Sequence, residues 1–200
     1  LANKTDYCYN FIEFEKLLKK SEESQATVYP RDKFICFSAS RLNPEKGFPR
    51  AISALSPVLK EYQDIMWYIA GDGQERNGIE KSIKENGLED RIILLGNQNN
   101  PYPYMKNADL YLSLSFHEAA PVVYMEAKAL GLPVFTTETS SSHEMLNDGT
   151  EDFICENSEN GIRRKFSEIM RERERVESAK QLIGSKVISN ERSFKKIYEW

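Results

Sequence analysis

Short apolar runs alternate along this chain with longer amphipathic segments. The apolar runs predict strands at 34–39, 65–70, 92–95, 110–113, 133–136 and 153–155. The segments between them predict helices at about 48–62, 75–86, 103–106, 121–131 and 142–147. Strands that alternate with helices are typical of a parallel sheet covered on both faces. The predicted fold class is therefore α/β, with a doubly wound, Rossmann-like parallel sheet.

Three segments modify this picture. Pro57 lies inside the predicted helix 48–62 and should kink that helix or end it early, because proline lacks a backbone donor. The polar stretch 21–31 is interpreted as a linker, and the charged run M-R-E-R-E-R-V-E at 170–177 as a solvated helix face with i,i+4 pairs. The predicted division of the chain is a linker with an N-terminal helix (1–31), a Rossmann-like domain (32–185) and a C-terminal helix (186–200).

Ligands of such sheets bind outside the carboxyl ends of the strands. The loops that follow the predicted strands are therefore the places to look for a site, namely 40–47, 71–74, 96–103, 115–121 and 137–142. The fourth of these loops leads into S-F-H-E-A-A-P-V-V-Y-M-E-A-K-A-L-G-L-P, where seven residues separate Glu118 from Glu126. Pro121 suits the first position of a helix, and Gly131 suits the residue just past its end. Glu118 is thus expected in the loop, and Glu126 more than one turn inside the helix.

This geometry can hold a nucleotide-sugar. The N–H groups from about Val122 onward would form an anion site at the helix start. Glu126 leans toward that end of the helix, and its carboxylate could accept both hydroxyls of a ribose. Glu118 could reach the sugar beyond the phosphates, and Ala119 and Ala120 would let a ligand approach the backbone closely. The spacing alone is equally compatible with a surface helix that carries two unrelated glutamates.

The loop S-A-S-R-L-N-P-E-K-G after the first strand supplies two cations, Arg41 and Lys46. A diphosphate without a metal would need such cations, since arginine offers bidentate contact and lysine a compact charge. Taken alone, both are also compatible with ordinary surface residues.

Three further segments after strands are candidates for lining a site. Gly71-Asp72-Gly73 is no G-x-G-x-x-G fingerprint, and it fits either a tight turn or a loop that approaches the ligand. Backbone groups at Leu95, Gly96 and Asn97 could pair with a base edge, although a plain turn fits equally well. Tyr102 and Tyr104 are interpreted as packing residues rather than a stacking platform.

Composition narrows the functional class. The 200 residues carry a net charge of −4, which argues against general nucleic-acid binding. No apolar run is long enough for a transmembrane helix, and no signal peptide is evident. Cys8, Cys36 and Cys155 have no zinc or redox spacing, Cys36 is expected to be buried, and no Asp-x-Asp signature occurs. We therefore expect a reduced, cytoplasmic protein with no metal and no cofactor.

Taken together, these motifs resemble the C-terminal, donor-binding domain of retaining glycosyltransferases of family 4, which have the two-lobed GT-B fold. R-L-N-P-E-K-G is similar to the phosphate-binding loop of that family, and I-A-G-D-G-Q to its Gly-Asp-Gly turn. Glu118 and Glu126 match its Glu-x7-Glu motif. Y-N-F-I-E near Tyr9 and F-K-K-I-Y-E-W at the end are similar to its linker and last helix, so the resemblance covers most of the chain. The version with N-P-Y-P-Y is most similar to bacterial enzymes that build capsule, lipopolysaccharide or other surface glycans.

The resemblance implies a reaction and a role for each candidate residue. A sugar would move from a UDP- or GDP-sugar to a glycan or lipid-linked acceptor, with retention, by front-face attack and without a metal. Arg41 and Lys46 would neutralise the leaving diphosphate, Glu118 would contact the transferred hexose or N-acetylhexosamine, and Glu126 would hold the ribose. The other residues expected to line the nucleotide-sugar are Gly71, Gly73, Leu95, Gly96, Asn97, Ala119, Ala120 and Val122.

The chain also departs from the family. Ala119 and Ala120 stand where the family often has glycine, and Ser140 to Ser142 replace a glycine-rich turn, which bears on the choice of sugar. The resemblance implies an N-terminal lobe that supplies much of the acceptor site, and we expect that lobe not to be part of these 200 residues. We therefore expect these 200 residues to bind a nucleotide-sugar weakly and to transfer no sugar alone. Acceptor binding, and any contact at the inner face of the cytoplasmic membrane, are expected of the full-length enzyme.

Two other readings remain open. One is a nucleotide-sugar epimerase or a phosphorylase of the same fold, and the other is a non-catalytic doubly wound interaction module. An epimerase should release product from the donor alone, and a phosphorylase should carry a lysine-bound pyridoxal cofactor. The substitution Glu126→Ala should abolish nucleotide binding in a donor lobe and change little in an interaction module.

Overall fold

The computed structural model describes residues 12–23, 29–146 and 149–184 of the chain. Cys8, the first three residues of the Y-N-F-I-E segment and the expected C-terminal helix 186–200 lie outside these residues.

The core of the molecule is a parallel sheet of six strands in the order β3-β2-β1-β4-β5-β6. The strands are β1 (Phe34–Ala39), β2 (Ile65–Ala70), β3 (Ile92–Gly96), β4 (Leu110–Ser113), β5 (Val134–Thr137) and β6 (Ile154–Cys155). Each coincides with a strand predicted from an apolar run, within one residue at either end. The doubly wound parallel sheet is therefore confirmed.

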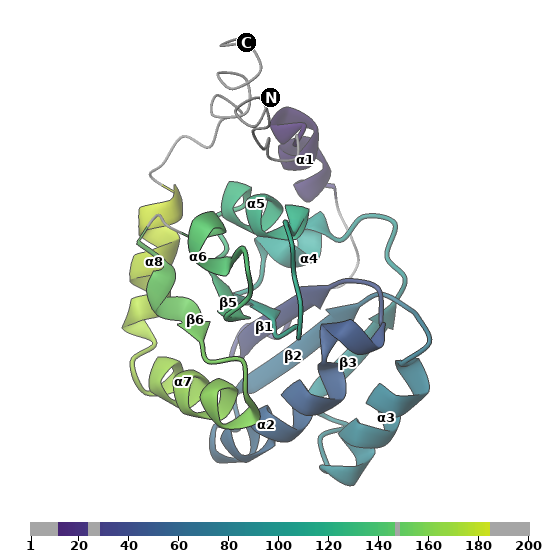
Figure 1. The fold of residues 1–200 in the computed structure, drawn as a ribbon. Coiled ribbons are helices and arrows are strands. Elements are labelled where there is room, and N and C mark those ends of the chain that lie inside the picture. Colours follow the sequence, from purple (N-terminus) through teal and green to yellow (C-terminus); the bar gives the residue numbers. More distant parts are fainter. Residues whose placement is uncertain (1–11, 24–28, 147–148, 185–200) are drawn as a thin grey trace, which may run out of the picture.

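Helices cover both faces of this sheet (Figure 1). On one face pack α2 (Phe48–Glu61), α3 (Arg76–Glu85), α7 (Glu159–Arg171) and α8 (Glu174–Gly184); on the other lie α4 (Tyr102–Lys106), α5 (Val122–Ala129) and α6 (Ser142–Met145). Helix α1 (Phe14–Ser21) packs on α4, and short 3₁₀ turns occur at η1 (Pro44–Lys46) and η2 (Glu151–Phe153). Cys36 and Phe37 are adjacent in β1 and lie in opposite cores, because successive strand residues face opposite sides. Cys36 is fully buried, as expected.

Two details of the helices correct the sequence prediction. Pro57 was expected to kink helix α2 or to end it early; the helix continues past Pro57 to Glu61, so the second of these alternatives is wrong. Burial of Ile52, Leu55 and Leu59 against the sheet outweighs the hydrogen bond that the proline removes. The expected single helix face at 170–177 is also wrong, because α7 ends at Arg171 and α8 begins at Glu174.

The break between α7 and α8 has an identifiable partner. Arg173 lies in the break, and its guanidinium donates to both carboxylate oxygens of Asp64. It also lies over the rings of Phe34 and Tyr62, at 5.2 and 5.5 Å from their centroids. The buried side chains of Met170 and Val176 flank it on either side. Arg173 thus anchors the break against residues at the amino ends of β1 and β2, whereas Arg171, Glu172, Glu174 and Glu177 of the charged run are exposed to solvent.

The strand order places a topological switch between β1 and β4. After β1 the chain winds outward through β2 to β3, and after β4 it winds the other way through β5 to β6. Loops that leave two such neighbouring strands in opposite directions open a crevice at the carboxyl edge of the sheet. In this protein the two loops are those after β1 and β4, which contain Arg41, Lys46 and Glu118.

Candidate functional site

Three adjoining hollows follow the carboxyl edge of the sheet. The central hollow, of about 360 Å³, lies at the β1–β4 switch and is lined by Arg41, Lys46, Ser115, Glu118 and Val122 among others. A second, the Glu126 hollow, of about 510 Å³, shares Arg41 with the central one. Its other polar lining residues are Ser40, Asp72, Asn97, Gln98, Tyr102 and Glu126. The third, the His117 hollow, of about 700 Å³, shares Lys46 and Glu118 with the central one. The crevice is thus continuous from Glu126 to His117.

Glu118 and Lys46 form an ion pair in the central hollow. The Lys46 Nζ lies 2.7 Å from Glu118 Oε1, and the Ser115 hydroxyl donates to the same oxygen at 2.8 Å. The two side chains are 11% and 23% exposed, so water screens the pair only partly. The backbone carbonyl of Glu118 accepts from the hydroxyls of Ser140 and Ser141 at 3.1 and 3.3 Å. The structure thus brings together two predicted site residues. It holds Glu118 by contacts from the loop after β1 and from the loop after β5.

Gly47 explains how the Lys46 turn comes so close to the Glu118 loop. Its φ is +64°, and a Cβ there would lie 2.9 Å from the carbonyl oxygen of Leu114. The loops are also joined directly, since the Phe116 N–H donates to the Glu45 carbonyl at 2.8 Å. A residue with a side chain at position 47 would push these loops apart and separate Lys46 from Glu118.

Arg41 lies on the wall common to the central and Glu126 hollows. Its side chain is exposed, and within the described part of the chain its guanidinium forms no ion pair. It is therefore a cation available to an anionic ligand, in contrast to Lys46, which is already paired.

Gly71 and Gly73 support the Arg41 loop. A Cβ on Gly71, whose φ is +140°, would lie 1.9 Å from the Ser40 carbonyl oxygen, and one on Gly73 would lie 2.6 Å from that of Leu42. The Leu42 N–H donates to the Asp72 carbonyl at 2.9 Å. Both glycines therefore let one loop rest on the other. Gly71 and Asp72 also line the Glu126 hollow, whereas Gly73 is not among its lining residues.

The end of β3 contributes side chains rather than free carbonyl groups to the crevice. The Leu95 carbonyl accepts from Gln98 Nε2 at 2.8 Å, and the Gly96 carbonyl accepts from the Gly71 N–H at 2.7 Å. Asn97 is exposed and lines the Glu126 hollow together with Gln98. A base in this hollow would therefore meet the amides of Asn97 and Gln98.

Helix α5 begins at the central hollow and places the remaining predicted residues. Pro121 precedes its first residue, one position earlier than expected, and Gly131 follows its end with a φ of +72°. Val122 is half-buried and lines the central hollow, whereas Ala119 and Ala120 are exposed in the preceding loop. Val122 and Val123 both line the central hollow. The first N–H groups of an α-helix have no intrahelical partner, so these two residues can offer backbone donors to a ligand there.

Glu126 lies in the second turn of α5 and receives a hydrogen bond that sequence reasoning missed. The Tyr102 hydroxyl donates to Glu126 Oε1 at 2.8 Å. Burial raises the pKa of Glu126, and the bond from Tyr102 opposes that effect. Burial and the nearby carboxylate raise the pKa of Tyr102 to about 12, so its hydroxyl remains a donor at neutral pH. Tyr102 lies in the segment 96–103, one of those that follow a strand and were expected to contain the site. Its place in that segment was the only sign in the sequence that it could belong to the site.

The described residues contain neither a metal-binding cluster nor a membrane-spanning helix. Across residues 12–23, 29–146 and 149–184, no cluster of three or more His, Cys, Asp or Glu side chains is placed to bind a metal ion. No helix within those ranges has the length and apolarity needed to span a bilayer.

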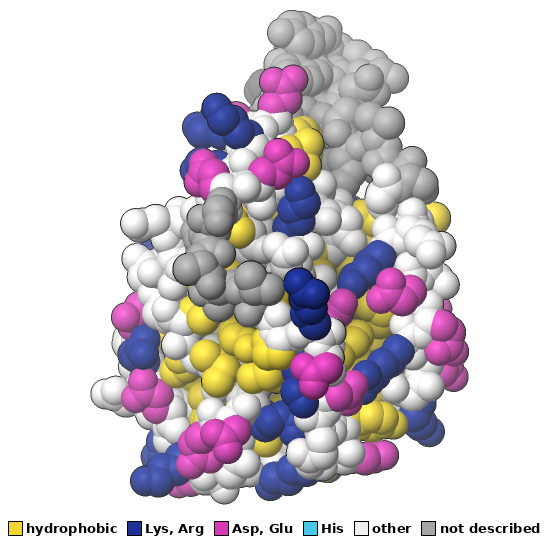
Figure 2. All heavy atoms as spheres, turned by 180° about the vertical axis from the view of Figure 1, so that it is seen from behind, with side chains coloured by type: hydrophobic (Ala, Val, Ile, Leu, Met, Phe, Trp, Pro, Cys, Tyr) yellow, Lys and Arg dark blue, Asp and Glu magenta, His cyan; other side chains and the backbone are white. Residues whose placement is uncertain are grey.

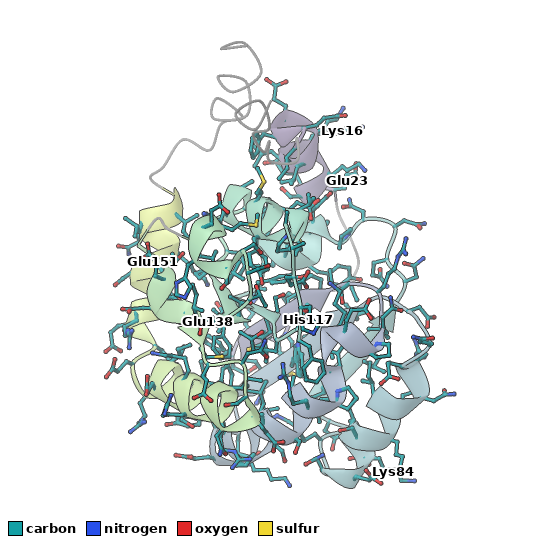
Figure 3. The ribbon with its side chains drawn as sticks, viewed as in Figure 1. Lys16, Glu23, Lys84, His117, Glu138 and Glu151 are labelled. Atoms are coloured by element: carbon teal, nitrogen blue, oxygen red, sulfur yellow. The ribbon has the colours of Figure 1, made fainter. Side chains whose placement is uncertain are left out.

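Acidic and basic side chains are interspersed on the face shown in Figure 2, around a group of hydrophobic ones. His117 and Glu138, on two loops that line the third hollow, are labelled in Figure 3.

Comparison with known sequences identifies the family. The sequence model described as "Glycosyl transferases group 1" matches residues 19–184. This chain belongs to the group 1 glycosyltransferases.

Curated relatives of this glycosyltransferase domain are considerably longer. It is 31% identical over 158 residues to an uncharacterized glycosyltransferase of Methanocaldococcus jannaschii, covering 78% of this chain and 37% of that protein. It is 32% identical over 146 residues to a Campylobacter jejuni enzyme, N-acetylgalactosamine-N,N'-diacetylbacillosaminyl-diphospho-undecaprenol 4-alpha-N-acetylgalactosaminyltransferase. That match covers 72% of this chain and 38% of the enzyme. The chain thus spans little more than a third of either relative.

Solved structures share its fold. Anabaena HepE in complex with UDP matches with a TM-score of 0.70 at 22% identity, over 84% of this chain and 48% of that one. TarM matches with a TM-score of 0.71 at 21% identity, over 88% of this chain and 36% of that one. This chain therefore has the fold of the Rossmann-like domain of GT-B glycosyltransferases.

Proposed function

We propose that this domain binds the nucleoside diphosphate-sugar donor of a retaining, family 4 glycosyltransferase. The observation that carries the proposal is the continuous crevice at the β1–β4 switch. Glu126 lines one hollow, Arg41 lines both it and the central hollow, and the start of α5 and the Lys46–Glu118 pair line the central hollow. This succession matches the order of a nucleotide-sugar, namely base and ribose, diphosphate, then sugar.

The Glu126 hollow suits the nucleoside. Glu126 would accept hydrogen bonds from the ribose hydroxyls, and the amides of Asn97 and Gln98 would meet the base, uracil or guanine. HepE, which shares this fold, was solved in complex with UDP, which supports a nucleotide as the ligand.

The central hollow suits the diphosphate. Arg41 and Lys46 bring two cations, and the Val122 and Val123 N–H groups at the start of α5 add donors of fixed orientation. As the bond to the sugar breaks, negative charge builds on the leaving diphosphate. Groups already aimed at that position stabilise it without reorganisation, which is the main catalytic contribution we assign to this domain. This charge set does the work for which a metal would otherwise be needed.

The sugar, a hexose or N-acetylhexosamine, would lie between the central and His117 hollows. Glu118 borders both, so its carboxylate can accept a sugar hydroxyl while Lys46 turns toward the phosphate. The acceptor would attack from the face that the leaving phosphate occupies, which gives retention. We place the acceptor, a glycan or lipid-linked sugar, on a further lobe of the full-length protein, acting in the cytoplasm at the membrane face. Relatives named for lipopolysaccharide core biosynthesis and for diphospho-undecaprenol substrates support a role in surface polysaccharide synthesis.

Calorimetric titration with UDP, GDP and their common sugar conjugates, in the presence of a chelator, tests the proposal. Saturable binding of one nucleotide should be lost in Glu126→Ala. The matched control is Glu61→Ala, an exposed glutamate at the end of α2, next to the amino ends of the strands. The control should bind like the parent chain. Binding that survives Glu126→Ala unchanged, or that requires a metal, would contradict the assignment.

A further inference from the structure

The geometry points to Tyr102 as a positioning residue that holds Glu126 ready for the ribose. This inference rests on the proposed function, because it assigns a task within the same donor site. Tyr102 is the first residue of α4 and Glu126 lies in α5, and both line the Glu126 hollow. Their contact, at 2.8 Å, links α4 to α5, which are separated along the chain by strand β4.

The contact leaves room for the ligand. An ionised carboxylate has about four lone-pair positions on its two oxygens. Tyr102 uses one, on Oε1, and within the described residues Glu126 Oε2 has no hydrogen-bond partner. A ribose can therefore donate from both hydroxyls without displacing Tyr102.

Tyr102 is itself fixed by the fold. Its N–H donates to the side-chain oxygen of Asn100 at 3.3 Å, and Asn100 is only 8% exposed. The Asn100 amide nitrogen donates at 2.9 Å to the carbonyl of Lys20 and to the carboxylate of Glu23, at the end of α1. Glu23 and the nearby helix α1 are seen in Figure 3. The residues that follow Tyr102 in α4, Pro103 to Met105, are buried. The hydroxyl is thus aimed at Glu126 by an anchored helix rather than by a free side chain.

The electrostatic setting makes such a donor necessary. Burial favours the protonated form of Glu126, and a protonated carboxyl cannot accept from both ribose hydroxyls with full strength. The other charged or titratable groups around it are Arg41 and Asp72 on the walls of the hollow and Tyr111 in the core below. The Tyr102 hydroxyl is the group that bonds the carboxylate directly, and so it favours the ionised form.

The test compares Tyr102→Phe with the parent chain and with Tyr68→Phe. Tyr68 is a matched control, because it lies in the core on the side of the sheet covered by α4, α5 and α6. Among the described bonds, its hydroxyl contacts only the Met66 sulfur, at 3.6 Å. Each protein is titrated with UDP and GDP and with the 2′,3′-dideoxy forms of both. Tyr102→Phe should weaken binding of the ribonucleotide about tenfold, the effect of one lost hydrogen bond to a charged group. It should leave the dideoxy form, which cannot reach Glu126, nearly unchanged.

A second readout needs no ligand. The Glu126 carboxyl carbon, followed by NMR over pH, should titrate at higher pH in Tyr102→Phe than in the parent chain or in Tyr68→Phe. An unchanged titration, or equal losses for ribose and dideoxy forms, would overturn the positioning role. If the titration moves but the parent chain binds neither nucleotide at millimolar concentration, the proposed donor site fails while the Tyr102–Glu126 contact stands.

Discussion

Lys46 and Glu118 are 72 residues apart in the chain and meet as an ion pair, with Nζ 2.7 Å from Oε1. The proposed function uses both, the lysine for the diphosphate and the glutamate for the sugar. In the absence of a donor each neutralises the other, so neither charge remains unbalanced in a hollow with limited access to water. Donor binding would then replace a contact between two loops by contacts of each loop with the ligand.

The first prediction concerns this pair. Lys46→Gln should lower the free energy of unfolding by about 1–3 kcal/mol, because among the described residues it leaves a mostly buried carboxylate with the Ser115 hydroxyl as its one remaining partner. Adding Glu118→Gln should restore most of the loss. Urea unfolding of both single variants and the double variant measures the coupling. Losses that simply add would show that the two charges do not interact.

A second prediction concerns the floor of the central hollow. The Tyr111 hydroxyl accepts from the Ala39 N–H at 3.0 Å and donates to the Ala39 carbonyl at 2.8 Å. Phe37 and Tyr111 are the last paired residues of β1 and β4. Beyond that pair, the Tyr111 side chain supplies the hydrogen-bond partners of the β1 backbone at Ala39. Tyr111→Phe should cost about 1–3 kcal/mol, because it leaves two backbone groups without partners. Tyr68→Phe, unfolded in parallel, should cost clearly less, and equal costs would refute this explanation.

A third prediction concerns the loop that carries Glu118. Arg50 donates to the Leu114 carbonyl at 2.9 Å and to Asn157 Oδ1 at 2.8 Å, and its guanidinium lies 3.8 Å from the Phe116 ring centroid. Asn157 in turn donates to the carbonyls of Phe116 and Glu138, at 3.0 and 3.1 Å. Arg50 and Asn157 thus fasten together the loops after β4, β5 and β6.

Arg50→Ala should therefore loosen residues 115–121 and raise their amide hydrogen exchange, with a several-fold loss of donor affinity. Arg163→Ala removes a half-exposed arginine of α7 that pairs with Glu159 at 3.2 Å, and it serves as the control. Exchange in 115–121 that is the same in both variants would show that Arg50 does not hold this loop.

The sequence predicted much of the fold because the apolar runs coincide with the strands. It was wrong where packing competes with a local rule: at Pro57, the buried face of α2 keeps the helix intact. It was also wrong at 170–177, where the contact of Arg173 with Asp64 joins positions 109 residues apart. No periodicity within a segment reports such a contact.

For the site, the sequence correctly placed Glu118 in a loop and Glu126 inside a helix, because Pro121 and Gly131 mark that helix. It could not predict that Lys46 pairs with Glu118 or that Tyr102 bonds Glu126. The first contact depends on β1 and β4 being neighbours, and the alternation of strands and helices leaves the strand order open. The second joins helices that follow β3 and β4, which are not neighbours, so it depends on how α4 and α5 lie on the sheet as well as on the strand order.

The last prediction follows from the burial of Glu126. Burial raises its pKa above the ordinary value of 4.5, so between that value and the raised one the folded chain holds more protons than the unfolded chain. The contribution of Glu126 to stability therefore falls as pH rises through this window, and above it the ionised side chain is a net cost. Glu126→Gln should thus increase the free energy of unfolding at pH 7 relative to the parent chain, and the gain should shrink toward pH 4. Denaturant unfolding at both pH values measures this, and nucleotide titration of the same variant should show lost binding. A variant that is less stable at pH 7 would mean that Glu126 is retained for the fold, whereas greater stability with lost binding is expected of a carboxylate retained for its ligand.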